Sequence, residues 1–389
     1  MRFRRLLRLL GTLAALVLAF ASESGSTARA GSVVDNLDWA GAAVKHMWLA
    51  PSTGKRRFVS QSGSNSNPGT RRRPWRTIQR GLKALRPGWT LYIRDGTYSQ
   101  NLVMQRAGRA SAPITVRNYP GERPVLRPGG GEPDNLPLQV GSGAAYVKFR
   151  GLVFAGATGS STANIYVWGS AHHIQFSRCV SRGSERQGFF SERSTRSIRI
   201  IGCYFRNNGG RGTDGSDHNL YVEGTHHVIA NNVVAGARNG FGIQLYPAGN
   251  RVVITSNTIV GSHNDGIVIG SEDATTTSNA VVVDNILAFN TGFGLSTYWG
   301  GPIGSANYAI RNLTWRNGDG GLTGSAIIFS GNLRGNPRFL NRSAGYYRLA
   351  RRSAAIDRAL ARFSPRVDYD GRSRPQGRRP DLGAFERAK

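Results

Sequence analysis

Acidic residues, cysteine and long apolar segments are all scarce in this sequence of 389 residues. Asp and Glu number 22 against 51 Lys and Arg, so the formal net charge is +29. Such an excess of positive charge attracts polyanions, mostly at low salt. The alternative is a compositional bias toward arginine, since lysine occurs only five times. Beyond the first 30 residues no stretch is long and apolar enough to cross a membrane, so we expect no membrane span.

The amino terminus has the pattern of a secretory signal peptide. Four arginines in the first eight residues precede an apolar run at 9–20, and Ala28-Arg29-Ala30 offers a small-residue cleavage site. We therefore predict that residues 1–30 are removed and that the mature protein is secreted, either extracellular or periplasmic. Exported proteins rarely meet nucleic acid, so the expected polyanion is an acidic polysaccharide, an anionic cell-wall polymer or a lipid head group, with no nucleic acid as the intended partner.

The chain contains a repeat with a spacing of 20 to 33 residues. Each repeat opens with alternating apolar residues and bends four residues after it starts. A unit this short buries its apolar side only by stacking on its neighbours, which predicts a solenoid of strands and sharp bends. The nine repeats begin at Leu91, Ile114, Val147, Ile174, Ile198, Val228, Val253, Val281 and Tyr308.

Two residue types recur at the bends. Cys179 and Cys203 each stand five residues after the start of adjacent repeats, which would lie roughly 4.8 Å apart. A disulfide could bridge that distance, and a stacked pair of buried thiols is the alternative. Asparagine suits a left-handed bend, and stacked amides can form a ladder along the axis. The asparagines in question are Asn232, Asn257, Asn285 and Asn312.

A second set of aligned strands occurs further along each repeat, and alternation separates its two faces. The predicted inward residues are Ile165, Val167, Leu220, Val222, Ile243, Leu245, Ile267, Ile269 and Leu295. The predicted outward row includes the aromatic residues Tyr166, Trp168, Phe190, Tyr221, Tyr246 and Tyr298. A soluble protein seldom exposes so many rings on one face, which indicates a sugar-binding surface. The alternative is that a loop or the C-terminal segment covers them.

The remaining segments divide into a beginning and an end. Residues 31–57 are predicted to be a linker or propeptide, and residues 58–90 an N-terminal cap whose helix at 77–85 covers the open end of the solenoid. The solenoid itself is assigned to residues 91–332. The arginine-rich residues 333–389 are predicted to be a C-terminal cap over the other end. Because both ends are covered in this prediction, we expect a monomer.

Two segments carry a resemblance to a known family. The entry segment reads FVSQSGSNSNPGT…PWRTIQ…LRPGWTLYIRDGTY, and the ending reads NPRFLN…GYYRLARRSAAID…DYDGRSRPQGRRPDLGAFE. Over roughly residues 58–386 the chain resembles the pectate-lyase-like superfamily of exported bacterial β-helix proteins. The resemblance implies an all-β fold, a right-handed parallel β-helix of about 9–10 coils with an N-terminal capping helix and a C-terminal cap. Such folds include lyases, hydrolases, uronate epimerases and proteins without known activity.

Catalysis is predicted around an inserted loop at 207–218, because inserted loops often carry function. The lyases that the chain resembles cut acidic polysaccharides by β-elimination, which needs a neutralised carboxylate, a base and an acid. We assign His218 as the base and Tyr221 or Tyr246 as the acid. Arg211 and Arg186 are predicted carboxylate clamps, because a guanidinium offers a bidentate fork.

Three aspartates near this loop, Asp214, Asp217 and Asp265, could hold Ca²⁺ or orient His218. The alternative is that Asp214 and Asp217 form turns and that His218 caps a strand through a turn carbonyl. The predicted substrate-binding residues are Tyr166, Trp168, Arg186, Phe190, Glu223, Gln244, His263 and Tyr298.

The leading prediction is a secreted carbohydrate-active enzyme, a polysaccharide lyase that cleaves a uronate-containing chain by β-elimination. A polygalacturonase-like hydrolase would instead use two carboxylates from among Asp214, Asp217, Asp265 and Glu223. A uronate epimerase would use much the same residues as the lyase. A non-catalytic surface protein would use the charge and the aromatic row only to bind a polysaccharide.

Overall fold

The computed structural model describes residues 37–131, 135–159, 163–210, 215–272, 275–298 and 303–388. The chain divides into two compact units, Met1–Asp38 and Trp39–Lys389. Of the first unit only Leu37 and Asp38 are among the described residues, and the solenoid lies in the second. The predicted signal peptide, residues 1–30, lies outside the described residues, as do the loop residues Arg211 and Asp214.

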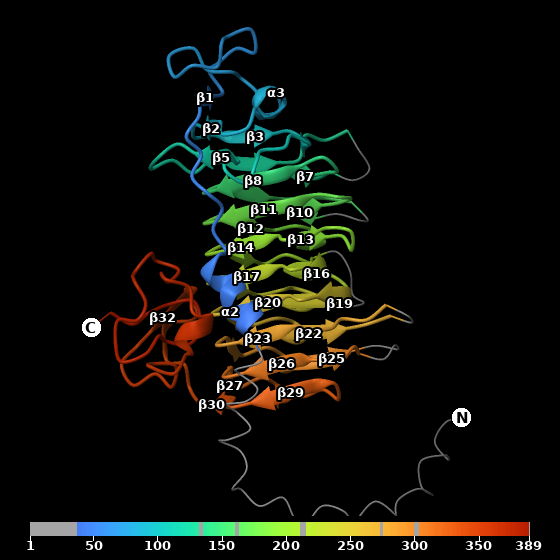
Figure 1. Cartoon of the computed structure of the whole chain (residues 1–389), viewed down its shortest axis with the longest axis vertical. Helices are drawn as coiled ribbons and strands as arrows, with labels where there is room; N and C mark the ends of the chain where they lie inside the picture. The colour runs from blue at the N-terminus through green and yellow to red at the C-terminus, as the bar shows by residue number, and fades with distance from the viewer. Residues whose placement is uncertain are drawn as a thin grey trace, which may run out of the picture. The chain divides into compact units, whose positions relative to one another are not determined.

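Three parallel sheets form the body of the protein (Figure 1). The eleven-stranded sheet consists, in spatial order, of β1 (Arg56–Val59), β2 (Thr90–Ile93), β5 (Ile114–Asn118), β8 (Ala145–Arg150), β11 (His172–Ser177), β14 (Arg199–Ile201), β17 (Val228–Ala230), β20 (Val253–Thr255), β23 (Val281–Val283), β26 (Asn307–Ile310) and β29 (Ile327–Ser330). The ten-stranded sheet consists of β3 (Thr97–Ser99), β6 (Val125–Arg127), β9 (Val153–Ala155), β12 (Val180–Arg182), β15 (Tyr204–Arg206), β18 (Val233–Ala235), β21 (Thr258–Val260), β24 (Ile286–Ala288), β27 (Leu313–Trp315) and β30 (Leu333–Arg334). The nine-stranded sheet consists of β4 (Leu102–Met104), β7 (Leu138–Val140), β10 (Ala163–Val167), β13 (Gln187–Ser191), β16 (Leu220–Thr225), β19 (Ile243–Asn250), β22 (Ile267–Gly270), β25 (Phe293–Tyr298) and β28 (Gly320–Leu322).

Successive strands visit the three sheets in turn, so each coil gives one strand to each sheet. The strands from β2 to β28 make nine such coils, and β29 with β30 begins a tenth. This arrangement is the right-handed parallel β-helix that the sequence predicted, and the stack of coils can be followed from blue to orange in Figure 1. Because the coils stack in register, residues from distant parts of the chain become neighbours on one face.

The inward residues of the coils form one continuous hydrophobic core. On β16 the side chains alternate, with Leu220 and Val222 buried and Tyr221 and Glu223 partly exposed. All of the predicted inward residues of the nine-stranded sheet belong to this core, which confirms that prediction. The alternation follows from the pleat, because successive side chains of a strand point to opposite faces.

The asparagine ladder at the bends is confirmed. The side-chain amide nitrogen of Asn232 donates to Asn257 Oδ1 at 2.9 Å, and Asn257 donates in the same way to Asn285 at 3.0 Å. Asn285 donates to Asn312 at 2.9 Å, and Asn312 to Asn332 at 3.1 Å. The ladder therefore satisfies buried amides that would otherwise cost free energy.

The left-handed residue of each of these bends is not the asparagine itself but the residue before it. The residues with positive φ are Asn231, Ser256, Asp284 and Arg311, with φ between 54° and 58°. The reason is that the predicted alignment of the repeats shifts by one residue at Val228. The alignment set Val228 opposite Ile198, whereas in the structure Val228 pairs with Arg199. The later repeat starts are therefore one residue late relative to the earlier ones.

Cys179 and Cys203 are buried free thiols in adjacent coils. The backbone N–H of Cys179 donates to Cys203 Sγ at 3.4 Å. Of the two alternatives that the sequence left open, the structure contains the stacked pair of thiols.

Helix α3 (Ile78–Ala84) lies at the start of the solenoid, next to β1 and β2 in Figure 1. The hydroxyl of Thr77 caps it by accepting from the backbone N–H of Arg80 at 3.3 Å. Ile78, Leu82 and Leu85 are buried against the first coils, as their helical spacing predicts. Within the described part of the chain, no helix has the length and apolarity to span a membrane.

Helix α2 (Asp38–Lys45) precedes an extended segment that is docked on the eleven-stranded sheet. The backbone N–H of Leu49 donates to Gln175 Oε1 at 3.0 Å, and the Lys148 ammonium donates to the carbonyl of Ala50 at 2.6 Å. Ser52 then hydrogen-bonds with Thr115 at 2.6 Å. We call residues 48–52 the strap. The strap crosses β11, β8 and β5 before the chain enters β1, so this part of the predicted linker packs on the solenoid.

The C-terminal segment covers a flank of the solenoid, whereas the sequence predicted that it covers the far end. It contains the antiparallel pair β31 (Phe339–Asn341) and β32 (Tyr346–Leu349) and the 3₁₀ helix η1 (Ala361–Phe363). Its apolar side chains pack on outward residues of β18, β21, β24 and β27, which are apolar. Burying that apolar surface is the physical reason for the lateral position. The residues in this second core include Val233, Val260, Ile286, Leu313, Tyr347, Leu349, Leu382 and Phe385.

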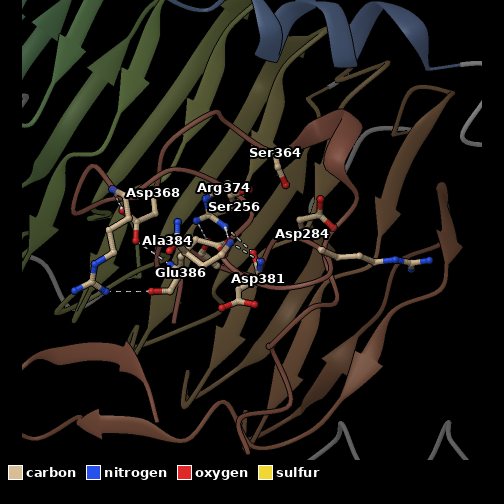
Figure 2. A network of polar contacts seen from close by, with 12 residues as sticks. Ser256, Asp284, Ser364, Asp368, Arg374, Asp381, Ala384 and Glu386 are labelled. Carbon is tan, nitrogen blue, oxygen red and sulfur yellow. Dashed lines mark hydrogen bonds and ion pairs between the residues drawn. The ribbon is translucent and has the colours of Figure 1, made fainter. Parts of the chain in front are cut away.

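A buried polar network joins the C-terminal segment to the bends of the solenoid (Figure 2). Arg374 Nη2 donates to Asn231 Oδ1 at 3.2 Å, and the carboxylate of Asp284 accepts from the backbone N–H of Leu360 at 3.1 and 3.0 Å. Burial raises the pKa of Asp284 well above its ordinary value. Asn231 and Asp284, which form bends of the solenoid, thus also bind the C-terminal segment.

Candidate functional site

The outer face of the nine-stranded sheet carries a row of aromatic rings, as predicted. Tyr166, Phe190 and Tyr221 are register partners on β10, β13 and β16. The rings of Tyr166 and Phe190 are stacked at a centroid distance of 5.3 Å, and Phe190 meets Tyr221 edge to face at 4.8 Å. Tyr221 in turn meets Tyr246 of β19 at 6.4 Å. We call these four partly exposed rings the aromatic row.

A second column of outward residues runs beside the aromatic row, two positions further along each strand. It includes Trp168, Glu192 and Glu223, which follow or lie in β10, β13 and β16. The Tyr166 hydroxyl donates to Glu192 Oε1, and the backbone N–H of Gly169 donates to Glu192 Oε2 at 2.9 Å. Burial and then the bond to Glu192 raise the pKa of Tyr166. Carboxylates and rings therefore share one face.

Glu223 is the most perturbed carboxyl group of this face. Its side chain is 13% exposed, and burial raises its pKa to about 7. Arg193 Nε lies 3.7 Å from Glu223 Oε2 and opposes this shift, whereas the nearby charges of Glu192 and Glu272 add to it. A carboxyl group with a pKa near neutrality exchanges protons readily at ordinary pH, which suits acid or base catalysis.

Tyr221, next to Glu223, is a neutral proton donor at ordinary pH. Burial, and then the charge of Glu223, raises the pKa of Tyr221. Tyr246 lies on the next strand and contributes to the same shift. The structure therefore places Tyr221, Tyr246 and Glu223 together, two of them predicted as catalytic and one as substrate-binding.

His218 lies beneath this face and not on it. It is 1% exposed, with its ring stacked on Phe241 at a centroid distance of 5.1 Å and tilted against Tyr221 at 5.7 Å. Its Nδ1 accepts from the backbone N–H of Phe241 at 3.0 Å. This geometry suits a residue that positions Tyr221, and it argues against the predicted role as the base, because a base must reach the substrate.

Asp217 and Arg186 form an ion pair with each other. Arg186 Nη1 lies 3.0 Å from Asp217 Oδ1, and the Asp217 side chain is fully buried. The amide nitrogen of Asn239 also donates to Asp217 Oδ2 at 3.4 Å. The predicted substrate clamp Arg186 therefore binds a carboxylate of the protein itself, and Asp217 stabilises the loop.

Asp265 is also held by donors of the protein. The backbone N–H of Phe293 donates to Asp265 Oδ1 at 2.6 Å, and the Ser296 hydroxyl donates to Oδ2. In the part of the chain that the structure describes, no three His, Cys, Asp or Glu side chains converge as metal ligands. Asp214, the third residue of the expected Ca²⁺ site, lies outside the described residues, so that site stays a prediction.

The other predicted substrate contacts are spread over the same sheet and its edge. Gln244 is the register partner of Tyr221 and is buried, with its Oε1 unpaired among the described residues. Tyr298 is 45% exposed at the end of β25, and His263 is exposed in the turn before β22. The ring of Tyr298 lies 6.2 Å from that of Phe241, so the rings continue beyond the aromatic row.

Sequence reasoning missed Glu192 and Arg193 as members of the site. The signal for Glu192 was present, because the alternation in residues 188–194 places it outward beside Phe190. Arg193 breaks the alternation, since it comes directly after Glu192 and is exposed where the strand has ended. Only the folded geometry places it next to Glu223.

Comparison with known proteins is consistent with this architecture. The family model described as Pel9A-like, right handed beta helix region, matches residues 57–307. The uncharacterized protein YwoF of Bacillus subtilis (strain 168) is 39% identical over 69 residues, which is 18% of this chain and 15% of that protein. Pectate lyase PEL9 of Emericella nidulans is 37% identical over 71 residues, 18% of this chain and 17% of that protein. The chain thus matches only about a sixth of the length of these relatives.

Two solved structures share the fold. The crystal structure of pectate lyase Pel9A has a TM-score of 0.61 at 16% identity, covering 87% of this chain and 97% of that one. A structure named glycoside hydrolase has a TM-score of 0.50 at 11% identity, covering 72% of this chain and 96% of that one. At such identities the likeness concerns the fold alone.

Proposed function

Because the chain belongs to the Pel9A-like right-handed β-helix family, we propose that it is an exported polysaccharide lyase that cleaves a uronate-containing chain by β-elimination. The observation that supports this most is the position of Glu223. This carboxyl group has a pKa of about 7 and lies on the same face as the aromatic row and Arg193. The pectate lyase among the relatives supports the reaction class, and the solved structure of pectate lyase Pel9A supports the fold.

Sugar binding follows from the aromatic row. The partly exposed rings of Tyr166, Phe190, Tyr221 and Tyr246 run along the coil axis, and each offers part of its surface. Pyranose rings present C–H faces that stack on aromatic rings, as apolar surfaces do in water. A polysaccharide would therefore extend across β10 to β19, with one sugar beside Glu223.

The chemistry assigns one role to each group. The Glu223 carboxylate takes the proton from C5 of the uronate, and the electron pair forms the C4=C5 double bond as the C4–O bond breaks. The hydroxyl of Tyr221 or Tyr246 gives its proton to the departing oxygen. Arg193 neutralises the uronate carboxylate and stabilises the charge that develops next to C5. His218 holds Tyr221 in place from below.

Hydrolysis is a second candidate, and one specific observation favours it. A carboxyl group with a pKa near 7 is half protonated at neutral pH, so Glu223 could instead protonate the glycosidic oxygen. Glu192, one strand away on the same face, would then be the second carboxylate. The solved structure named glycoside hydrolase is compatible with this alternative.

One assay separates these readings. The purified protein is incubated with a panel of uronate polymers, and ultraviolet absorbance of the unsaturated product is followed together with reducing ends. A lyase gives both signals, a hydrolase gives reducing ends alone, an epimerase changes the uronate composition without cleavage, and a binding protein retains the polymer unchanged.

The variant Glu223→Gln tests the assignment of the base. We expect it to lower kcat by about 10²- to 10⁴-fold, the usual contribution of a positioned acid or base. Glu272→Gln is the matched control, because it makes the same chemical change in an exposed neighbour and should cost less than about tenfold. Full activity of Glu223→Gln would remove Glu223 from the mechanism.

A further inference from the structure

A cavity of about 330 Å³ lies between the strap and the outer face of the eleven-stranded sheet. The strap gives it Trp48, Leu49, Pro51 and Ser52, and strands β2, β5, β8 and β11 give the other wall. The side chains of that wall include Tyr92, Thr115, Arg117, Lys148, Arg150 and Gln175. This site belongs to a different sheet from the aromatic row, so nothing in the proposed cleavage chemistry uses it.

A second cavity, of about 300 Å³, adjoins the first one. Arg117 and Arg150 line both cavities, and Arg123 and Arg178 line only the second. Arg117 and Arg150 are register partners on β5 and β8, so their side chains are neighbours on one face. Each of the two cavities is within the usual size range of small-molecule sites.

The cations of this region lack acidic partners. No ion pair of the described residues includes Arg117, Lys148, Arg150 or Arg178. Burial, and then the charges of Arg150 and Arg117, lower the pKa of Lys148 to about 8. Burial, and then Arg117 and Arg178, lower the pKa of Arg150. The protein therefore holds several like charges together against their mutual repulsion, an arrangement that a bound anion would stabilise.

The walls also offer groups that suit a sugar ring. The Trp48 indole is 41% exposed at the cavity, and Ser52 and Thr115, whose hydroxyls hydrogen-bond to each other at 2.6 Å, also line it. Two neighbouring guanidinium groups match the planar geometry of a carboxylate. The indole ring, the hydroxyls and the guanidinium groups together are the groups that would bind a sugar carrying a carboxylate.

We propose that this strap cavity is an accessory binding site for an acidic sugar residue, separate from the cleavage site. The carboxylate of the sugar lies between Arg117 and Arg150, and its ring stacks on Trp48. Such a site lets the protein hold an acidic polysaccharide at a face where no bond is cleaved, which raises the local concentration of the polymer.

Isothermal titration with a galacturonate trimer tests the proposal, with the Glu223→Gln protein as the background so that nothing is cleaved. The matching neutral galactose trimer and inorganic phosphate are the comparison ligands. We expect two trimers to bind per chain if the aromatic row also binds this sugar, and one if it does not. Arg150→Ala should remove one binding event in either case, so failure of the proposed function does not obscure this result.

Three further variants complete the test. Arg117→Ala and Trp48→Ala should weaken the same binding event at least about tenfold. Arg351→Ala removes an equal charge from an exposed position of the C-terminal segment and should change nothing. Because Trp48 is partly exposed, its replacement leaves the fold intact and keeps the test valid where an arginine variant is unstable.

Two outcomes would overturn the proposal. One is equal binding by the Arg150→Ala, Trp48→Ala and parent proteins. The other is binding of phosphate or of the neutral trimer at the strap cavity as tightly as the galacturonate trimer. Tight binding of phosphate would mean a general anion site. Tight binding of the neutral trimer would mean that the site does not recognise the carboxylate.

Discussion

Arg374 and Glu386 form an ion pair of 2.9 Å in which the two side chains are 1% and 0% exposed. The same guanidinium donates to the carbonyl of Gly383 at 2.7 Å and to Asn231 Oδ1 at 3.2 Å. Asn231 is a left-handed bend residue of the solenoid. One buried cation thus joins the end of the chain to the turn of a coil more than a hundred residues earlier, as Figure 2 shows for Arg374 and Glu386.

Arg374→Met should lower the free energy of unfolding by about 3 to 5 kcal/mol, because it leaves the carboxylate of Glu386 buried without its cation. Adding Glu386→Leu should restore part of the loss, because it removes the uncompensated carboxylate. The recovery should be incomplete, because the backbone N–H groups of Gln376 and Asp381 lose their acceptor. Urea unfolding of the three proteins measures both effects. A single variant as stable as the parent would show that the pair contributes nothing to the fold.

The pH dependence of kcat/KM distinguishes the two candidate reactions. If Glu223 is the base of β-elimination, it acts as the carboxylate, so kcat/KM should rise with pH through about 7. If Glu223 is the acid of hydrolysis, kcat/KM should fall through the same pH. Measuring kcat/KM of the parent enzyme between about pH 5 and pH 9, roughly two units on either side of this pKa, distinguishes the two roles. A flat profile would contradict both roles.

Glu223→Gln should stabilise the fold at alkaline pH even though it lowers activity. The folded state raises the pKa of Glu223 from 4.5 to about 7, so it binds this proton more tightly than the unfolded chain does. That contribution to stability is complete below pH 4.5 and is lost as the pH rises through about 7. At pH near 8 the variant should therefore gain about 1 to 3 kcal/mol.

Thermal or urea unfolding at two pH values checks this prediction. The parent and the variant should differ at the higher pH and converge near pH 4, below the ordinary pKa of about 4.3 for Glu. A gain that is the same at both pH values would come from packing and not from the carboxyl charge.

Asn257→Ala should be strongly destabilising, because Asn257 is fully buried in the middle of the ladder. The change removes the acceptor of the backbone and side-chain N–H groups of Asn232, together with the side-chain donor to Asn285 Oδ1 and the Ile229 carbonyl. We expect a total cost of about 2 to 4 kcal/mol. Asn332→Ala, at the end of the ladder, removes the acceptor of the Asn312 N–H groups and the donor to the Ala309 carbonyl. It should cost about half as much, because Asn332 is partly exposed and water can replace its bonds. Equal losses of unfolding free energy for the two variants, measured by urea unfolding, would contradict the prediction that a central ladder residue stabilises the fold more than the last one.

Sequence periodicity predicted the fold well because the signal is local. Leu220, Val222 and Ile243 alternate with polar or aromatic neighbours, and the pleat of a strand turns that alternation into an inside and an outside. The helix at 77–85 was predicted for a similar reason, since its buried residues have helical spacing. The same local signal placed Tyr166, Phe190 and Tyr221 in one row.

The sequence could not predict the surroundings of residues that contact distant parts of the chain. His218 and Asp217 stand at a loop that looks exposed in sequence, yet both are buried by partners such as Phe241 and Arg186. The pKa of Glu223 depends on charges that follow two other strands, Glu192 and Arg193 after β13 and Glu272 after β22. The C-terminal segment was assigned to the end of the solenoid because nothing in its own sequence reveals the apolar flank on which it packs.

The strap imposes an order on the assembly of this protein. Leu49 bonds to Gln175, 126 positions later, so the docked strap requires that the coil containing β11 already exists. A chain that emerges from its amino terminus must therefore keep residues 48–52 undocked while the first coils wind. The strap cavity therefore forms only after the early coils have stacked, and a chain with misstacked early coils would not form it.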